Sequence, residues 1–121
     1  MSARGVGMVL CLVAALIASA QMAQIQSAGT QFMQQMNGSM ERMDRQVAKA
    51  PMNGNVDHDF ASMMIPHHQG AIDMAKAELV YGKDPVMRRL AQEILVDQQS
   101  EIDAMRLWLE KTTAGNSQKE K

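Results

Sequence analysis

Cysteine is almost absent from this sequence, because the single Cys11 lies in an apolar run near the amino terminus. Disulfide bonds and thiolate sites for structural zinc are therefore excluded for the rest of the chain. Aromatic residues make up only 3% of the sequence and the formal net charge is −1, so the basic, aromatic-rich surface of a nucleic-acid-binding protein is also missing. No segment has the alternating pattern of a half-buried strand. The expected fold class is all-α.

Long hydrophobic runs are also missing, apart from a short one at the amino terminus. A basic start ending at Arg4, an apolar segment over Val6–Ile17 and the small residues Ala18-Ser19-Ala20 form the pattern of a secretory signal peptide. The apolar segment is too short to span a bilayer, although an uncleaved membrane anchor is the alternative. We therefore expect residues 1–20 to be a signal peptide cleaved before Gln21. The mature protein would be periplasmic or secreted and not an integral membrane protein.

Leucine is missing between residues 26 and 71, where methionine replaces it. This region contains seven Met, one Ile and no Leu, whereas Leu is used from residue 79 onward. A core that needed only apolar volume would use Leu in both halves, since Leu is better ordered. The bias indicates that sulfur itself is used. A Met-rich, adaptable binding groove is the alternative interpretation.

Three helical segments are separated by the few Pro and Gly residues. An apolar stripe with steps of three and four predicts a first helix of about five turns, built on Met33, Met36, Met40, Met43 and Val47. Asn37-Gly38-Ser39 interrupts this stripe, with Ser39 expected to cap the second piece, and Ala50-Pro51 ends it.

A second helix is expected from a cap at Asp57 or Asp59 to about Tyr81, with a kink or break at Pro66. Gly82 then ends it, and Asp84 and Pro85 start a third helix that runs to about Lys111. Residues 21–112 would form a single helical metal-binding domain, and residues 113–121 a disordered tail.

The short connection folds the second and third helices into an antiparallel hairpin. Counting outward from Gly82-Lys83 places His67 opposite Gln98, Met64 opposite Glu101 and Phe60 opposite Met105, with Trp108 at the far end. Gln98 and Glu101 then point toward the interior, where polar groups need partners. The histidines opposite them would complete either a structural polar layer or a metal site.

The segment MMIPHHQGAIDMA at residues 63–75 carries soft donors at helical spacing. Met63 lies one turn from His67, Met64 lies one turn from His68, and Met74 follows His67 by two turns. Thioether combined with imidazole is a donor set that suits copper, above all Cu(I). The alternative is that the methionines fill the core and the histidines are satisfied at the bundle surface.

Several motifs resemble those of the bacterial domain-of-unknown-function 305 family, including its CopM-type periplasmic copper-binding proteins. The resemblance extends over about Val56–Leu109, and its segments are DHDF at 57–60, MMIPHHQGAIDMA at 63–75, YGKDP at 81–85, LAQEI at 90–94 and QQSEIDAMRLWL at 98–109. It implies a small ferritin-like helical bundle that is exported and binds copper. The ligands that it implies are His67, His68, Met63, Met64, Met74 and Met105.

The amino-terminal helix departs from the family pattern, because this chain has no His before His58. A second site on that helix would contain only thioethers, from Met36, Met40 and Met43, and would suit Cu(I) or silver.

The sequence therefore predicts an exported Met- and His-rich protein that binds copper, Cu(I) before Cu(II) or silver, for buffering, transfer or resistance. Glu101 is a further candidate ligand, or it orients the ligands together with Gln98 and Asp73. Enzymatic activity is not expected, since the chain lacks the Glu-x-x-His of ferritin-like dimetal sites and has no Ser or Cys that pairs with a histidine. The open alternative is an interaction module whose Met-rich helix covers a partner or completes a homodimer. A transient copper-transfer partner is compatible with the main prediction.

Overall fold

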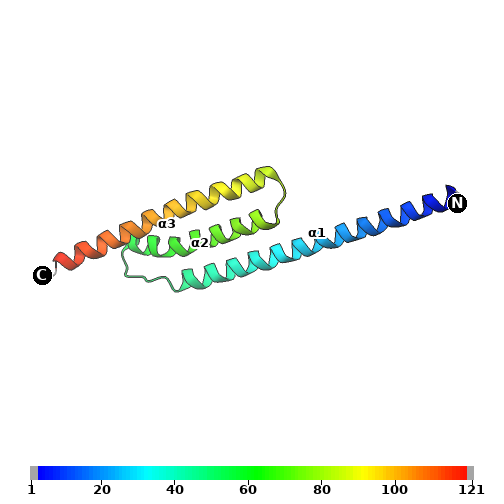
Figure 1. Ribbon diagram of the computed structural model, residues 1–121. Coiled ribbons are helices and arrows are strands. Elements are labelled where there is room, and N and C mark those ends of the chain that lie inside the picture. Colours follow the sequence, from blue (N-terminus) through cyan, green and yellow to red (C-terminus); the bar gives the residue numbers. More distant parts are fainter. Residues whose placement is uncertain (1–2, 120–121) are drawn as a thin grey trace.

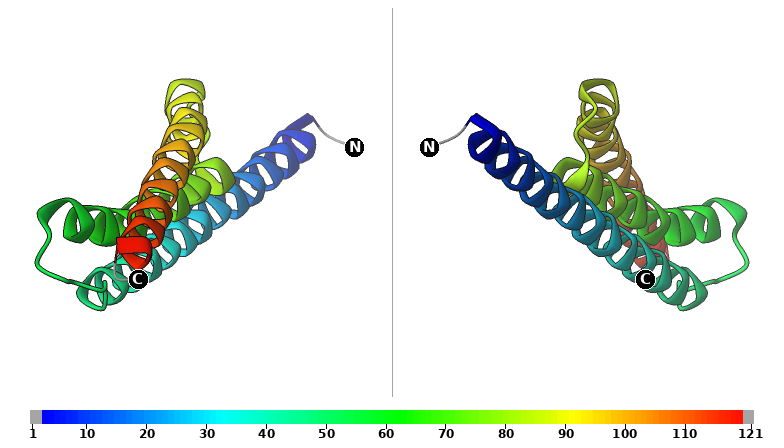
Figure 2. Two further views of the ribbon diagram at one scale, coloured as in Figure 1. Left: turned by 90° about the vertical axis from the view of Figure 1, so that its left-hand side faces the viewer. Right: turned by 90° about the vertical axis from the view of Figure 1, so that its right-hand side faces the viewer.

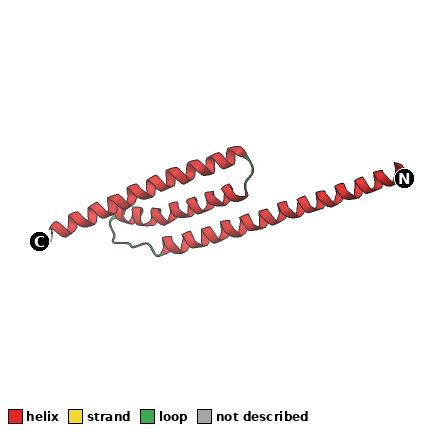
Figure 3. Cartoon of the chain, in the orientation of Figure 1, coloured by secondary structure: helices red, strands yellow, loops and turns green. Residues whose placement is uncertain are grey.

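The computed structural model describes residues 3–119, which form three helices: α1 (Ala3–Ala48), α2 (Val56–Tyr81) and α3 (Pro85–Lys119) (Figure 1). Only two loops separate them, and the described part of the chain contains no strand (Figure 3). The all-α prediction is confirmed. So is the antiparallel hairpin, which α2 and α3 form.

The helices are arranged with α2 in the middle, between α1 and α3 (Figures 1 and 2). Over the described residues, no Cα atom of α1 lies within 8 Å of a Cα atom of α3. The buried apolar side chains are accordingly few and mostly small: Ala61, Ile72, Ala75, Ala77, Ala91 and Ile102. The chain is a single layer of helices in which α2 is buried on two opposite sides.

The contact between α1 and α2 requires a glycine. A Cβ atom added at Gly70 would lie 2.6 Å from Met43 Sδ and 2.8 Å from Met43 Cβ, closer than van der Waals contact allows. On the same side of α2, Arg42 approaches Asp73 at 3.7 Å, and the rings of Phe32 and Tyr81 meet edge to face. Gly70 therefore lets the two helices approach closely.

Helix α1 is continuous through Asn37-Gly38-Ser39, so the predicted interruption is wrong. The hydroxyl of Ser39, which is only 1% exposed, donates a hydrogen bond to the Gln35 carbonyl at 2.9 Å. A serine that bonds back to the carbonyl four residues earlier remains inside a helix and does not cap one. The helix also includes most of the segment that we predicted to be a signal peptide. None of the three helices, over residues 3–119, combines the length and hydropathy needed to cross a bilayer.

The N-cap of α2 is Asn55, not Asp57 or Asp59 as predicted. Its side-chain oxygen accepts hydrogen bonds from the backbone N–H groups of Asp57 and His58, at 3.0 and 3.1 Å. Asp59 instead turns back to the preceding loop, where its carboxylate accepts from the N–H groups of Asn53 at 2.8 Å and Gly54 at 3.1 Å. The bond from Asn53, and after it the bond from the His58 ring, lower the pKa of Asp59. The Asp59 carboxylate thus holds the loop before α2, whereas the sequence pattern predicted that it could cap the helix.

The hairpin connection follows the predicted chemistry. Asp84 accepts hydrogen bonds from Val86 N at 2.9 Å and Met87 N at 3.0 Å, which confirms it as the N-cap of α3. The Arg88 guanidinium fastens the end of α2 by donating to the Leu79 and Gly82 carbonyls.

Two helix boundaries differ from the sequence prediction. Helix α2 continues through Pro66 without a break. Helix α3 extends to Lys119, beyond the end expected near Lys111 and into the segment expected to be a disordered tail.

Candidate metal centre

An imidazole and a carboxylate meet between the two helices of the hairpin. His68 Nε2 lies 2.7 Å from Glu101 Oε2, and the His68 side chain is only 12% exposed. The other ring nitrogen, Nδ1, is buried and has no hydrogen-bond partner among the described residues. With Nε2–H donated to Glu101, Nδ1 keeps a free lone pair. This is the arrangement by which a carboxylate fixes the tautomer and orientation of a metal-binding histidine.

The partner of Glu101 differs from the predicted one by one helical turn, since Glu101 was expected opposite Met64 and His67 opposite Gln98. Two effects shift the register in the same direction. The connection is an extended segment centred on Lys83, and side chains lean toward the amino terminus of their own helix. In an antiparallel pair this lean brings a residue nearer the turn on α2 into contact with a residue further from the turn on α3.

Two methionines occupy the next turn along the hairpin. Met64 precedes His68 by four residues and Met105 follows Glu101 by four, so both belong to the turn further from the connection. Both side chains are half-buried. The antiparallel pairing that joins His68 to Glu101 therefore sets Met64 opposite Met105.

A pocket of about 300 Å³ opens beside this methionine layer, lined by Asp57, Phe60, Ala61, Ala104, Met105 and Trp108. The predicted proximity of Phe60, Met105 and Trp108 is confirmed, because all three line it. The hairpin thus places imidazole, carboxylate and thioether groups in consecutive turns next to an accessible pocket.

The other donors of α2 lie on a neighbouring stripe. His67 is exposed, with its ring centroid 6.0 Å from that of His68, and Met63 is 38% exposed. Met74 follows His67 on this stripe and is half-buried. The predicted ligand set is therefore divided. Met64 and His68 face α3, whereas Met63, His67 and Met74 lie outside the contact between α2 and α3.

The methionines of α1 also differ in their surroundings. Met43 packs against Gly70 and serves the contact between α1 and α2. Met36, like Met43, is half-buried, whereas Met40 is exposed and is the most accessible of the three.

The two residues predicted to orient the ligands have different positions. Gln98 Nε2 donates a long hydrogen bond of 3.5 Å to Oε2 of Glu101, the residue that Gln98 was expected to accompany. Asp73 does not orient the His68 site: it accepts from Gln69 at 3.3 Å and pairs with Arg42 and Lys76, each at 3.7 Å. Five residues separate Asp73 from His68, and at about 100° per residue Asp73 points toward α1.

Over residues 3–119, no group of three or more His, Cys, Asp or Glu side chains comes together. The donors that adjoin the His68–Glu101 pair along the two helices are the thioethers of Met64 and Met105. One imidazole, one carboxylate and two thioethers form a donor set that favours a soft metal ion.

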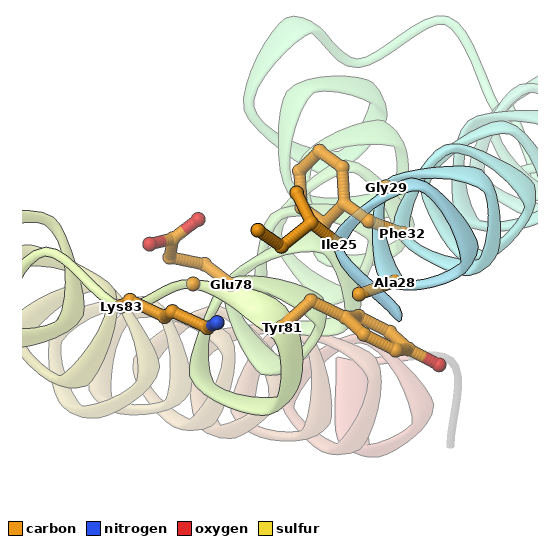
Figure 4. Close-up of a pocket in the computed structure, with 8 residues that line it drawn as sticks. Ile25, Ala28, Gly29, Phe32, Glu78, Tyr81 and Lys83 are labelled. Carbon is orange, nitrogen blue, oxygen red and sulfur yellow. The ribbon is translucent and has the colours of Figure 1, made fainter. Parts of the chain in front are cut away.

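The sequence analysis did not predict a second pocket of about 380 Å³, which lies at the hairpin end of the layer (Figure 4). It lies between α1 and the end of α2, and its lining residues are Ile25, Ala28, Gly29, Phe32, Glu78, Tyr81, Gly82 and Lys83. The available signal was the spacing of Ile25, Gly29 and Phe32, one helical face that begins before the Met33 stripe.

Comparison with known proteins gives one family match and one relative. Residues 8–109 match the family model described as "Domain of unknown function (DUF305)". An uncharacterized protein of Acanthamoeba polyphaga mimivirus is 43% identical over 49 residues, which cover 40% of this chain and 32% of that protein. The match therefore spans about a third of the relative's length.

Proposed function

The chain belongs to the domain of unknown function 305 (DUF305) family, and from this starting point we propose that it binds copper as cargo, Cu(I) in preference to Cu(II). The observation that carries the proposal is the buried His68 ring, whose Nε2 is held by Glu101 while Nδ1 has no hydrogen-bond partner in the described part of the chain. A buried nitrogen without a hydrogen bond costs free energy unless something binds it. A metal ion at Nδ1 would remove that cost.

The neighbouring thioethers decide which ion fits. Met64 and Met105 are soft, neutral ligands that suit Cu(I) and silver and bind magnesium or calcium poorly. Thioethers need no deprotonation, so their share of the binding does not depend on pH as that of a thiolate would. His67 and Met63 lie on the adjoining stripe of α2 and supply further nitrogen and sulfur donors there.

Export is a part of the same proposal. The basic, apolar and small-residue order of residues 1–20 is that of a signal peptide, and the spacing of the later motifs resembles CopM-type periplasmic copper-binding proteins. Outside the cytoplasm a free thiol would be oxidised or bridged, whereas methionine and histidine remain available as ligands. The function we infer is buffering, transfer or resistance in an exported compartment, without catalysis.

An anaerobic titration of the purified protein with Cu(I), in competition with a chelator of known affinity, tests the proposal. Replacing His67 and His68 together by Ala should weaken Cu(I) binding at least tenfold, about 1.4 kcal/mol. His58→Ala is the matched control, since His58 pairs with Asp59 at the start of α2 and should leave the affinity unchanged. A double variant that binds Cu(I) as tightly as the parent would make the central motif structural.

A further inference from the structure

The three helices share one apolar side. Its exposed residues recur at helical spacing along each helix: Ile25 and Met33 on α1, Phe60 and Met63 on α2, and Leu90 and Trp108 on α3. We call these six residues and the stripes they mark the apolar face.

The two pockets show that the three stripes lie on the same side of the layer. The pocket at the hairpin end is lined by Ile25 of α1 and Glu78 of α2, and Glu78 shares the stripe of Phe60. The pocket at the other end is lined by Phe60 of α2 and Trp108 of α3. The stripe of α2 is thus joined to α1 at one end and to α3 at the other.

The opposite side of the layer is polar. Asp73 of α2 pairs there with Arg42 of α1 and with Lys76, and Gln69 donates to the same carboxylate. The ion pairs of the layer thus lie on the side opposite the exposed Met, Phe, Leu and Trp side chains, and Glu78 is a charged residue that shares the apolar side.

A single layer leaves this apolar face uncovered. Globular domains bury their apolar stripes between two layers, and among residues 13–113, whose burial the structure describes, the only large fully buried apolar side chain is Ile102. The chain exposes 9132 Å², whereas a compact protein of its mass exposes about 6,500 Å². Part of this excess belongs to the projecting half of α1, and the remainder is surface of the kind that a stable interface, at roughly 800 Å² per partner, removes from water.

We infer that a second copy of this chain covers the apolar face, so that two three-helix layers enclose one core about a two-fold axis. The copy supplies what the fold lacks, a layer of matching length with its own apolar side, through the same residues in both subunits. The net charge of −1 gives two copies little reason to repel each other. This inference does not depend on copper binding.

Sedimentation velocity of the purified protein without added metal, at tens of micromolar, tests the inference. The parent should sediment as a dimer. Phe60→Glu and Leu90→Glu, each of which places charge on the apolar face, should raise the dimer dissociation constant at least a hundredfold. Val96→Glu is the matched control, because Val96 is 69% exposed on α3 but lies off the apolar face, and it should leave the dimer intact.

Circular dichroism of the same variants keeps the test decisive if one of them unfolds. Phe60 is 60% exposed in the single chain, so a charge there would not disturb an isolated layer. Loss of helix in Phe60→Glu but not in Val96→Glu would therefore also support a covering copy.

Two outcomes would overturn the inference: a parent that is monomeric and fully helical, or a dimer that Val96→Glu weakens as much as Phe60→Glu does.

Discussion

At the scale of single residues, the adjacent histidines His67 and His68 have different surroundings. His68 is buried against α3 with Nδ1 unpartnered, whereas His67 is exposed on the next stripe. We expect His68→Ala to account for most of the tenfold loss of Cu(I) affinity expected for the double variant, and His67→Ala to have a smaller effect. Competition titrations of the two single variants measure the difference. Equal losses would show that burial does not distinguish the two rings.

In the proposed copper site, Glu101 would act on the ion through His68. Glu101→Gln keeps the shape of the side chain but removes the carboxylate that orients His68. Loss of such a partner typically weakens metal binding about 10- to 100-fold. The affinity of Glu101→Gln for Cu(I) should therefore fall, while its helix content by circular dichroism stays that of the parent. An unchanged affinity would mean that Glu101 neither binds nor orients.

Asp59 makes the stability of the loop before α2 depend on pH. Its pKa is lowered in the folded chain, first by the Asn53 N–H and then by His58. The stabilisation is therefore complete above the unfolded pKa of about 3.9 and is lost as the pH falls through the folded value. In urea unfolding, Asp59→Asn should be less stable than the parent at pH 6, and the gap should narrow as the pH falls below about 3.9. A gap that stays the same size as the pH falls would contradict this origin.

At the scale of the helices, the packing of α1 on α2 depends on a single glycine, Gly70. Gly70→Ala would set a methyl group against Met43 Sδ, Cγ and Cβ, all within 2.8 Å, so the helices must separate. We expect a loss of about 1–3 kcal/mol in the free energy of unfolding, the usual cost of overpacking. Gly29→Ala is the control, because nothing lies within 4 Å of an added Cβ there and helix propensity should give a gain of up to about 1 kcal/mol. Urea unfolding of both variants decides, and a stabilised Gly70→Ala would show that the contact is loose.

Local signals predicted the elements well and their register less well. Asp84 and Pro85 identified the start of α3, because a cap and a fixed backbone angle act within a few residues. The pairing of His68 with Glu101 depends on how far side chains lean along two antiparallel helices. Counting residues outward from the turn does not take this lean into account. The prediction that Ser39 caps a helix was wrong for a related reason. A serine can cap a helix, but inside a helix it can equally donate to the carbonyl four residues earlier.

At the scale of the whole molecule, the amino-terminal part of α1 projects away from the hairpin. The α1 residues that line the pocket with α2 begin at Ile25, and Leu16 and Ile17 are exposed. Cleavage before Gln21 would therefore remove helix without removing the contact of α1 with the hairpin. We expect intact-mass spectrometry of protein recovered from an exporting host to show a chain that starts near Gln21. An intact Met1 in that fraction would contradict export by cleavage.

The most direct test of copper binding by histidine and methionine is X-ray absorption at the copper edge of the Cu(I)-loaded protein. We predict a first coordination shell that contains both sulfur and nitrogen. In a chain cleaved before Gln21, which has no cysteine, that sulfur is thioether. His68→Ala should lose nitrogen scattering and keep sulfur. A shell of nitrogen and oxygen alone would contradict the proposed function, and so would a parent spectrum that His68→Ala leaves unchanged.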